Sequence, residues 1–192
     1  DYKKLSNQQI QKLREHEVVV LDKAKKESFQ FKDFDIQTYH WAGKGDKVLL
    51  IHGWEGQAGN FADVIEELVK QDFDVYAFDA PCHGYSSKGK TSLFDFTEIV
   101  GIFIKKWSVQ KLISHSFGGV ATTYALFCNP ELQIDNYALL TTPDKFSERI
   151  DDVSEQVGIT EKVKRKLVKR LEKEFGQDPY LLNVSEFVKD IR

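Results

Sequence analysis

The segment that decides the fold is Lys111-Leu112-Ile113-Ser114-His115-Ser116-Phe117-Gly118-Gly119. An apolar run ends at Ser116, and two glycines then open a run with the composition of a helix. This is the pattern of a nucleophile elbow, a sharp strand-to-helix turn that presents a serine hydroxyl above a parallel sheet. The turn needs small residues two positions before and after the serine, and Ser114 and Gly118 meet that need. Ser114 departs from the usual first glycine.

Two further segments end expected strands with polar motifs. Residues 48–54 form an apolar run that closes in His-Gly-Trp, and residues 73–86 run into an Asp-x-Pro-x-His-Gly-x-Ser loop. In order and spacing the three motifs resemble those of the α/β-hydrolase superfamily, over about residues 28–145. His52 to Gly56, together with the elbow, is similar to a group of bacterial serine hydrolases. The resemblance implies a doubly wound, mostly parallel sheet of the α/β class.

Composition sets limits on the class of protein. The chain has 192 residues, of which 41% are hydrophobic and 30% charged, with a formal net charge of −3. These values fit one soluble domain and give no reason to expect nucleic acid as a partner. No apolar run is long enough for stable insertion into a membrane. Cys82 and Cys128 lack a paired spacing for a metal. We expect a cytoplasmic protein with no metal or organic cofactor, and the oligomeric state stays open.

Hydrophobic periodicity predicts alternating strands and helices. A helix is expected over about residues 5–26 and an antiparallel edge hairpin over 28–42. Strands then alternate with helices, which implies parallel βαβ units covered on both faces. The expected strands are 47–52, 74–79, 111–115 and 135–141, and the expected helices are about 61–71 with Asn60 as N-cap, 93–107 with Ser92 as N-cap, and 117–128. Residues 1–143 are therefore assigned to the hydrolase-type core.

Residues 144–192 have helical patterning and form the second predicted region. Within it, 161–175 is amphipathic, with Val163, Leu167, Leu171 and Phe175 on one stripe, and Gly176 opens a break over 176–179. A solvated basic face over a packed apolar stripe is the preferred interpretation, with a membrane-surface role as the alternative. In the superfamily, helices inserted after the sixth strand form a cap over the active site, and this region resembles such a cap.

The residues expected to carry chemistry cluster at the elbow. Ser116 is the candidate nucleophile for acyl transfer. The resemblance implies an oxyanion hole made by two backbone N–H groups, those of Phe117 and Trp54. The substrate is expected to be a small-molecule acyl compound. Each of the three histidines in the motifs is interpreted as organising a loop rather than acting in catalysis; these are His52, His83 and His115.

The triad is where the sequence departs from the family. A serine hydroxyl needs a base, normally a histidine oriented by a carboxylate, and the family order is serine, acid, histidine. No histidine follows His115. Asp144 occupies a known alternative position for the acid and is kept as a candidate. We expect the C-terminal strands, with the acid and histidine, to be missing; the alternative is a natural short form without hydrolytic activity.

These inferences lead to one preferred function and two rivals. The preferred function is cleavage of a carboxylic ester, thioester or amide through an acyl-enzyme on Ser116, although the 192-residue chain by itself is expected to be inactive or slow. One rival is a non-catalytic α/β-hydrolase-fold binding protein without a complete triad. The other is a different reaction class, either acyl transfer to an acceptor other than water or attack by a serine-activated species on a non-ester substrate. No motif identifies the substrate.

Overall fold

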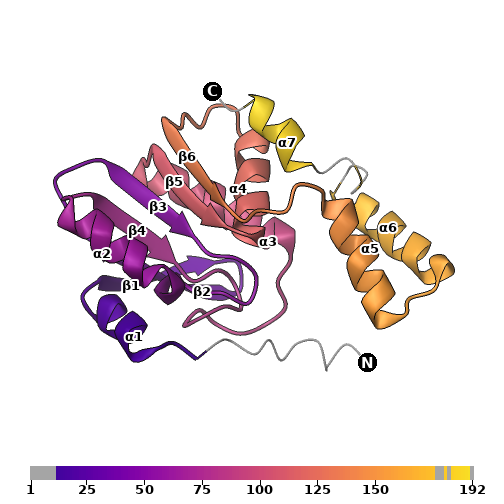
Figure 1. Ribbon diagram of the computed structural model, residues 1–192, viewed down its shortest axis with the longest axis horizontal. Helices are drawn as coiled ribbons and strands as arrows, with labels where there is room; N and C mark the ends of the chain where they lie inside the picture. Colours follow the sequence, from indigo (N-terminus) through magenta and orange to yellow (C-terminus); the bar gives the residue numbers. More distant parts are fainter. Residues whose placement is uncertain (1–11, 176–179, 181–182, 191–192) are drawn as a thin grey trace.

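The computed structural model describes residues 12–175, 180 and 183–190, and its centre is one six-stranded sheet (Figure 1). The strand order across the sheet is β1-β2-β4-β3-β5-β6. The strands are β1 (Lys25–Phe31), β2 (Phe34–Trp41), β3 (Lys47–Ile51), β4 (Asp74–Phe78), β5 (Lys111–His115) and β6 (Asn136–Leu140). The expected strands are confirmed to within a residue at most ends.

The sheet is mixed, with its parallel part around β3. β1 and β2 form an antiparallel hairpin, and β2 pairs antiparallel with β4. β3 lies between β4 and β5 and pairs parallel with both, and β6 extends the parallel part beyond β5. Strand order reverses direction next to β3, as in a doubly wound sheet, so the carboxyl ends of β3, β4 and β5 meet at one edge. The expected fold class is confirmed.

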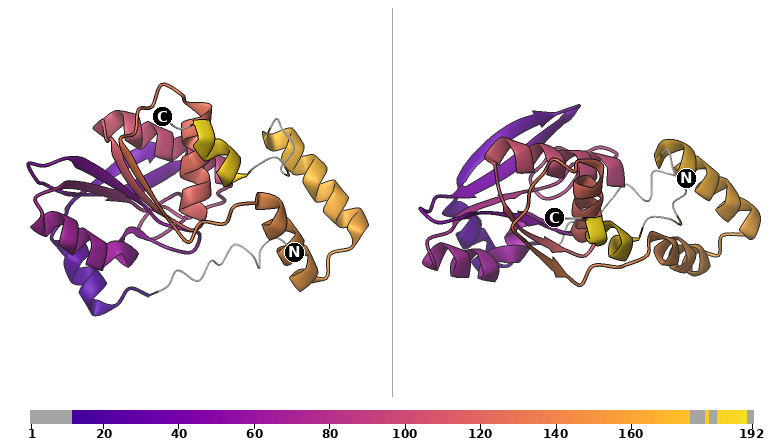
Figure 2. Two further views of the ribbon diagram at one scale, coloured as in Figure 1. Left: turned by 45° about the horizontal axis from the view of Figure 1, so that its top comes forward. Right: turned by 90° about the horizontal axis from the view of Figure 1, so that it is seen from above.

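Helices cover both faces of the sheet (Figure 2). α3 (Leu93–Trp107) and α4 (Phe117–Cys128) pack on one face through a large aromatic and aliphatic cluster. α1 (Glu15–Asp22), the 3₁₀ turn η1 (Ala58–Phe61) and α2 (Ala62–Lys70) pack on the other, over β2, β4 and β3. Burial of these two clusters supplies the main driving force for folding.

The N-terminal helix is shorter than expected. α1 begins at Glu15, residues 5–11 of the expected helix lie outside the described residues, and Lys25 already belongs to β1. The reason is pairing, since β2 continues to Trp41 and gives Lys25 and Lys26 partners in the ladder. The apolar patch in α1 does face the core, because Val20 and Leu21 are buried.

The two expected N-caps have different outcomes. Ser92 Oγ accepts the Asp95 N–H at 3.4 Å, so the cap of α3 is confirmed. The prediction for Asn60 is wrong, because Phe61 is the N-cap residue of α2. Asn60 Oδ1 instead accepts the Gln57 N–H at 2.9 Å and closes η1. Because η1 leads directly into α2, the polar cap lies at the start of η1, about one turn earlier than the apolar periodicity indicated.

Two helices after β6 form an antiparallel hairpin beyond the carboxyl ends of the strands (Figure 1). They are α5 (Phe146–Val157) and α6 (Glu161–Phe175), and the latter matches the expected helix over 161–175. Gly176 and the expected break over 176–179 lie outside the described residues. We call α5 and α6, residues 146–175, the helical hairpin.

The chain returns to the core after the hairpin. α7 (Val184–Phe187), followed by the short turn η3 (Val188–Asp190), brings Val184 and Phe187 into the cluster that contains α4. The two stems of the hairpin meet where Lys145 pairs with Asn183 in an isolated bridge. The Asp144 carbonyl accepts the Val184 N–H at 2.9 Å. We call this junction, residues 144–145 and 183–185, the clamp.

The outermost parallel strand, β6, presents apolar side chains to solvent. Leu139 is 37% exposed and Leu140 40% exposed. The other edge strand, β1, starts with the charged residues 25–27 instead. Charged side chains protect a sheet edge from further pairing, whereas apolar ones do not.

Candidate active site

Ser116 is held in a strained backbone conformation at the junction of β5 and α4. Its φ and ψ are 51° and −123°, a region that non-glycine residues rarely occupy. The Ser116 N–H donates to the Leu140 carbonyl at 2.9 Å, and the Ser116 carbonyl accepts the Gly119 N–H at 2.9 Å. The neighbouring strand and the first turn of α4 therefore hold the strain in place, as at many functional sites.

Close packing explains the small residues around Ser116. A side-chain carbon on Gly118 would overlap the His52 carbonyl, so the start of α4 passes against the loop after β3. Ser114 is fully buried, and its hydroxyl lies 2.7 Å from the Tyr137 hydroxyl. Tyr137 also donates to the Gly119 carbonyl at 3.3 Å. The departure from glycine at position 114 therefore adds a hydrogen bond between β5 and β6.

The two expected oxyanion donors lie on adjoining segments. Phe117 is the first residue of α4, and Trp54 lies in the loop after β3. Their rings meet edge-to-face with centroids 5.1 Å apart. Within the described part of the chain, neither backbone N–H donates to a main-chain carbonyl. Helix N-termini favour negative charge, so this corner suits a developing anion.

His52 is a neutral, fully enclosed loop anchor. Its Nε2 accepts the Ala80 N–H at 2.9 Å, and its Nδ1 donates to the Gly53 carbonyl at 2.7 Å. Burial, assisted by the nearby His83, lowers the pKa of His52 to about 3. The bond to Ala80 ties the loop after β3 to the loop after β4. Both ring nitrogens have hydrogen-bond partners, so neither is free to act as a base.

Asp79 is the centre of the third motif. One carboxylate oxygen accepts the Ala58 N–H at 2.8 Å, and the other accepts the Tyr39 hydroxyl and the Tyr85 N–H, each at 2.8 Å. Burial raises the pKa of Asp79, and these three bonds oppose the rise. Gly84 has φ +47°, and a side chain there would overlap this carboxylate. The Asp-x-Pro-x-His-Gly spacing therefore serves to bury one carboxylate with its donors.

His83 lies beside this group but leaves one nitrogen without a described partner. Its Nδ1 donates to the Pro81 carbonyl at 2.9 Å, and its Nε2 is buried without a hydrogen bond among the described residues. Burial lowers the pKa of His83. Its ring contacts Trp54 edge-to-face at 5.1 Å. The imidazole supports the Trp54 wall.

Ser116 opens into a groove of about 1060 Å³ between the elbow and the helical hairpin. Trp54, Phe94 and Phe117 give it apolar walls, and Val153 and Leu171 reach it from the hairpin. Its charged lining consists of four carboxylates and one lysine: Glu55, Asp144, Glu148, Asp152 and Lys145. Lys145 pairs with Glu148 at 3.2 Å. The groove is therefore acidic around an apolar middle.

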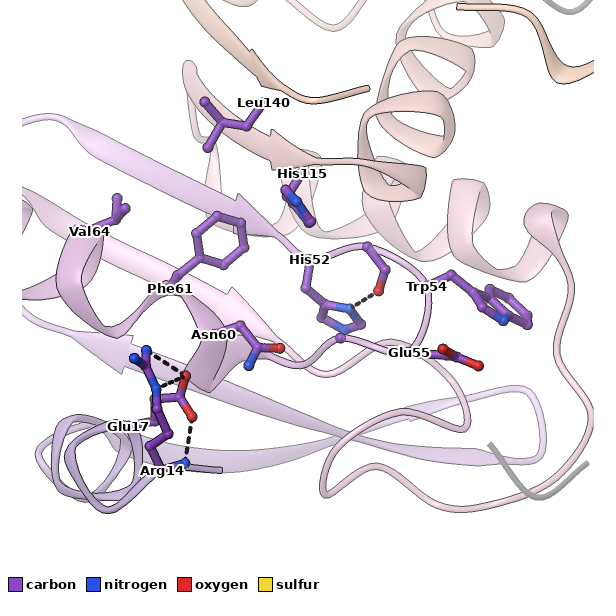
Figure 3. A pocket seen from close by; sticks show the side chains of 12 residues that line it. Arg14, Glu17, His52, Trp54, Glu55, Asn60, Phe61, Val64, His115 and Leu140 are labelled. Atoms are coloured by element: carbon purple, nitrogen blue, oxygen red, sulfur yellow. Dashed lines mark hydrogen bonds and ion pairs between the residues drawn. The ribbon is translucent and has the colours of Figure 1, made fainter. Parts of the chain in front are cut away.

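A second cavity of about 590 Å³ lies on the other side of Trp54 (Figure 3). His115 and Leu140 line it from the sheet, and Arg14 and Glu17 line it from the N-terminal segment. Ser116 and His115 thus open into different cavities, as expected for consecutive residues. Arg14 is already engaged by Glu17 at 3.0 Å.

Asp144 lines the groove with Ser116, but its carboxylate has another partner. Oδ1 accepts the Ser185 N–H at 2.7 Å, and Oδ2 accepts the Ser185 hydroxyl at 3.1 Å. Asp144 therefore caps the start of α7 from the clamp. Among the described residues no histidine is hydrogen-bonded to either Ser116 or Asp144.

Sequence reasoning missed the acidic lining and the second role of Asp144. Glu55, Glu148 and Asp152 lie in separate segments, so only the folded chain brings them together. Among the described residues, no group of three His, Cys, Asp or Glu side chains could hold a metal. Within the same residues no helix is long and apolar enough to cross a bilayer.

Comparison with known proteins identifies the family of the chain. A family model described as alpha/beta hydrolase fold matches residues 46–174. A human serine hydrolase-like protein is 33% identical over 108 residues, which cover 52% of this chain and 51% of that protein. Pimeloyl-(acyl-carrier protein) methyl ester esterase of Stenotrophomonas maltophilia (strain K279a) is 31% identical over 91 residues, covering 47% of this chain and 34% of that enzyme.

Solved structures show the same fold. The thioesterase domain from the curacin biosynthetic pathway superposes with a TM-score of 0.57 at 24% identity, covering 64% of this chain and 47% of that domain. The aligned segments span about half, or less, of the length of the curated relatives.

Proposed function

The chain belongs to the α/β-hydrolase fold family, and we propose that Ser116 is the nucleophile of an ester-cleaving serine hydrolase. The observation that carries the proposal is the strained Ser116 backbone at the start of α4, facing the groove. Backbone strain at a solvent-facing serine has no stabilising role of its own, so it supports a functional one.

The proposed reaction begins with attack of Ser116 Oγ on an acyl carbonyl. The carbonyl oxygen becomes an oxyanion that the N–H groups of Trp54 and Phe117 receive, each contributing about 3 kcal/mol. When this intermediate collapses, the bond between the acyl carbon and the alcohol oxygen or thiol sulfur breaks, and the alcohol or thiol leaves with the proton that Ser116 gave up. Water then attacks the acyl-serine, which releases the acid and restores the Ser116 hydroxyl. The proton of Ser116 needs an acceptor, which is not among its described contacts. Activity of the whole protein therefore depends on a base that reaches Ser116 from elsewhere.

The charge of the groove favours substrates with a neutral acyl part. Four carboxylates surround the space in which the acyl chain would lie, and a single lysine is paired with one of them. A free carboxylate or phosphate there would meet like charges. We therefore infer that uncharged esters or thioesters enter the groove, with the apolar walls holding the acyl chain.

The test is labelling with a fluorophosphonate probe, read by intact mass. We expect one slow adduct on the 192-residue chain, accelerated by exogenous imidazole, which can accept the proton of Ser116. Ser116→Ala should abolish the adduct. Ser92→Ala is the matched control, because Ser92 lines the same groove, and it should keep the adduct. An adduct that survives Ser116→Ala would overturn the assignment.

A binding role without turnover is the second candidate. It is favoured by one observation, that the Asp144 carboxylate is occupied by Ser185 and no described histidine bonds Ser116. Under this alternative, imidazole would not accelerate labelling, and the groove would bind an ester without cleaving it.

A further inference from the structure

The outer face of α6 carries a straight line of lysines. Lys162, Lys166, Lys169 and Lys173 follow one another at intervals of four, three and four residues. At 3.6 residues per turn they lie within about 60° of the helix circumference and extend over about 16 Å. We call these four residues the lysine stripe. Its opposite face carries Leu167 and Leu171, which are partly buried.

The lysine stripe is exposed and unneutralised. All four side chains are exposed, and among the described residues none has a carboxylate within ion-pair distance. Lys164, on the inner side of the same helix, contrasts with them because it pairs with Asp151 at 2.6 Å. The inner lysine forms an ion pair across the hairpin, whereas the four outer lysines form none with the residues that the structure describes.

Charge distribution indicates what kind of surface the stripe attracts. Residues 161–175 contain seven basic and three acidic residues, a net charge of +4, so the rest of the chain carries −7 to give the total of −3. An extended polyanion such as a membrane or a nucleic acid would reach beyond the stripe's length of about 16 Å onto a surface of net negative charge, whereas a compact acidic domain can stay on the stripe. The stripe also contains no apolar residue that could enter a bilayer. A compact acidic surface is the better match.

Geometry limits the occupant further. Leu171 lines the groove of Ser116 from the other side of α6, so the stripe and the groove are separated by the width of one helix, about 10 Å. The groove itself is acidic. A partner that contacts both the lysine stripe and the groove must keep its negative charge on the stripe. The part that reaches around α6 to Ser116 must be neutral.

We propose that the lysine stripe docks a small acidic protein domain that carries the acyl substrate on a flexible arm. The role of the docked domain as a substrate rests on the proposed hydrolase function, whereas docking itself depends only on the lysine stripe of α6. It names the substrate class as an acyl group tethered to an acidic carrier, with recognition by charge at the stripe and chemistry at Ser116.

The experiment measures binding of a fluorescent acyl carrier protein by anisotropy. The 192-residue chain carries Ser116→Ala, so that binding is read without turnover. Lys166→Glu with Lys169→Glu should weaken binding at least tenfold. Lys44→Glu with Lys70→Glu changes the net charge equally at the far end of the sheet and should change binding less than twofold. All four substitutions are at exposed positions, and lysine and glutamate have similar helix propensity, so we expect both double variants to fold. Circular dichroism checks that they do.

The alternative partners are tested in parallel. Vesicles containing phosphatidylserine and a short DNA duplex replace the carrier in the same assay, and both should bind more weakly than the carrier. Tighter binding of either, no carrier binding, or equal losses in the two double variants would overturn the docking proposal. Fluorophosphonate labelling of Lys166→Glu with Lys169→Glu, with Ser116 intact, should match the unsubstituted chain. If neither the double variant nor the unsubstituted chain is labelled, the result counts against the hydrolase function rather than against docking.

Discussion

The loops around Ser116 and the helical hairpin line the same groove, but they are built differently. The motif loops, residues 52–57, 79–86 and 114–119, are held by buried polar groups with several partners each, such as Asp79 and His52. The hairpin is joined across its helices by the ion pair of Lys164 and Asp151, and Glu148 and Asp152 of its first helix line the groove. The loops hold the Ser116 hydroxyl in place through buried hydrogen bonds, whereas the hairpin lines the opposite side of the groove.

This difference separates chemistry from selection. Atoms that stabilise a transition state must not move, and only buried, fully bonded loops give that rigidity. A surface that selects substrates, such as the groove side of the helical hairpin, can change in sequence without disturbing these atoms. We therefore expect substitutions in the motif loops to cost stability and reactivity together, and substitutions in the hairpin to change binding alone.

The largest effect is expected at Gly118. Gly118→Ala places a carbon against the backbone oxygen of His52, which cannot move without opening the elbow, so the free energy of unfolding should fall by about 3 kcal/mol. Fluorophosphonate labelling of Ser116 should fall with it. The matched control is Gly101→Ala in α3, where a side-chain carbon would meet only the Asn129 amide nitrogen at an ordinary contact distance of 3.7 Å, and it should stabilise by about 0.5–1 kcal/mol. Urea unfolding measures the free energy of unfolding of both variants. Equal effects of the two substitutions would contradict the special packing requirement at Gly118.

Asp79→Asn tests the buried carboxylate. An amide can satisfy some of the three donors but turns an N–H₂ toward others, so unfolding should become easier by about 2–3 kcal/mol. Asp152→Asn makes the same change on the hairpin, where the side chain is exposed, and should shift the urea midpoint only slightly. A small effect at Asp79 would show that the motif loops are less constrained than their bonding indicates.

Acid should weaken the loops through His52. Its folded pKa of about 3 lies below the ordinary 6.5, so below pH 6.5 the unfolded chain binds a proton that the folded chain refuses. Stability is therefore lost as the pH falls from 6.5 toward 3, by about 2 kcal/mol between pH 7 and pH 5. His83 adds to the loss in the same direction.

The control for this pH dependence is His52→Gln, which cannot titrate. Its stability should depend on pH less steeply than that of the unsubstituted chain, by the same amount of about 2 kcal/mol over that range. Parallel pH profiles for the two proteins would show that His52 titrates normally in the folded state.

The smallest effect is expected in the hairpin. Lys164→Ala removes the cross-helix pair with Asp151, which is exposed to solvent and screened by salt. The thermal midpoint should not change measurably, and labelling of Ser116 should keep its rate. A cooperative loss of the elbow in this variant would mean that the hairpin and the motif loops form one unit.

The sequence predicts the elbow well because its signals are local. A strand, a serine and two small residues occur within nine positions, and the backbone contacts that require them follow from one tight turn. The prediction of α6 succeeds for the same reason, since its apolar stripe repeats along one segment. The end of the expected N-terminal helix fails because strand pairing with β2, a distant interaction, decides where β1 begins.

The remaining gaps arise where residues far apart in sequence meet. Nothing near Asp144 indicates that Ser185 will occupy its carboxylate, and nothing near Glu55 indicates that Asp152 will face the same groove. Asn60 shows a subtler limit. It is predicted as the N-cap of α2, but its side chain accepts the Gln57 N–H at the start of the 3₁₀ turn η1, and Phe61 is the N-cap of α2.

The clamp has a consequence for how this molecule can be re-engineered. Because Lys145 and Asn183 are paired, the chain leaves the core and re-enters it at neighbouring points. A segment joined between these two neighbouring points does not have to cross the sheet, so we expect the helical hairpin, residues 146–175, to be exchangeable. Helical segments of other lengths, transplanted between the same two anchors, would give a set of chimaeras with one unchanged serine and many different entrances to it.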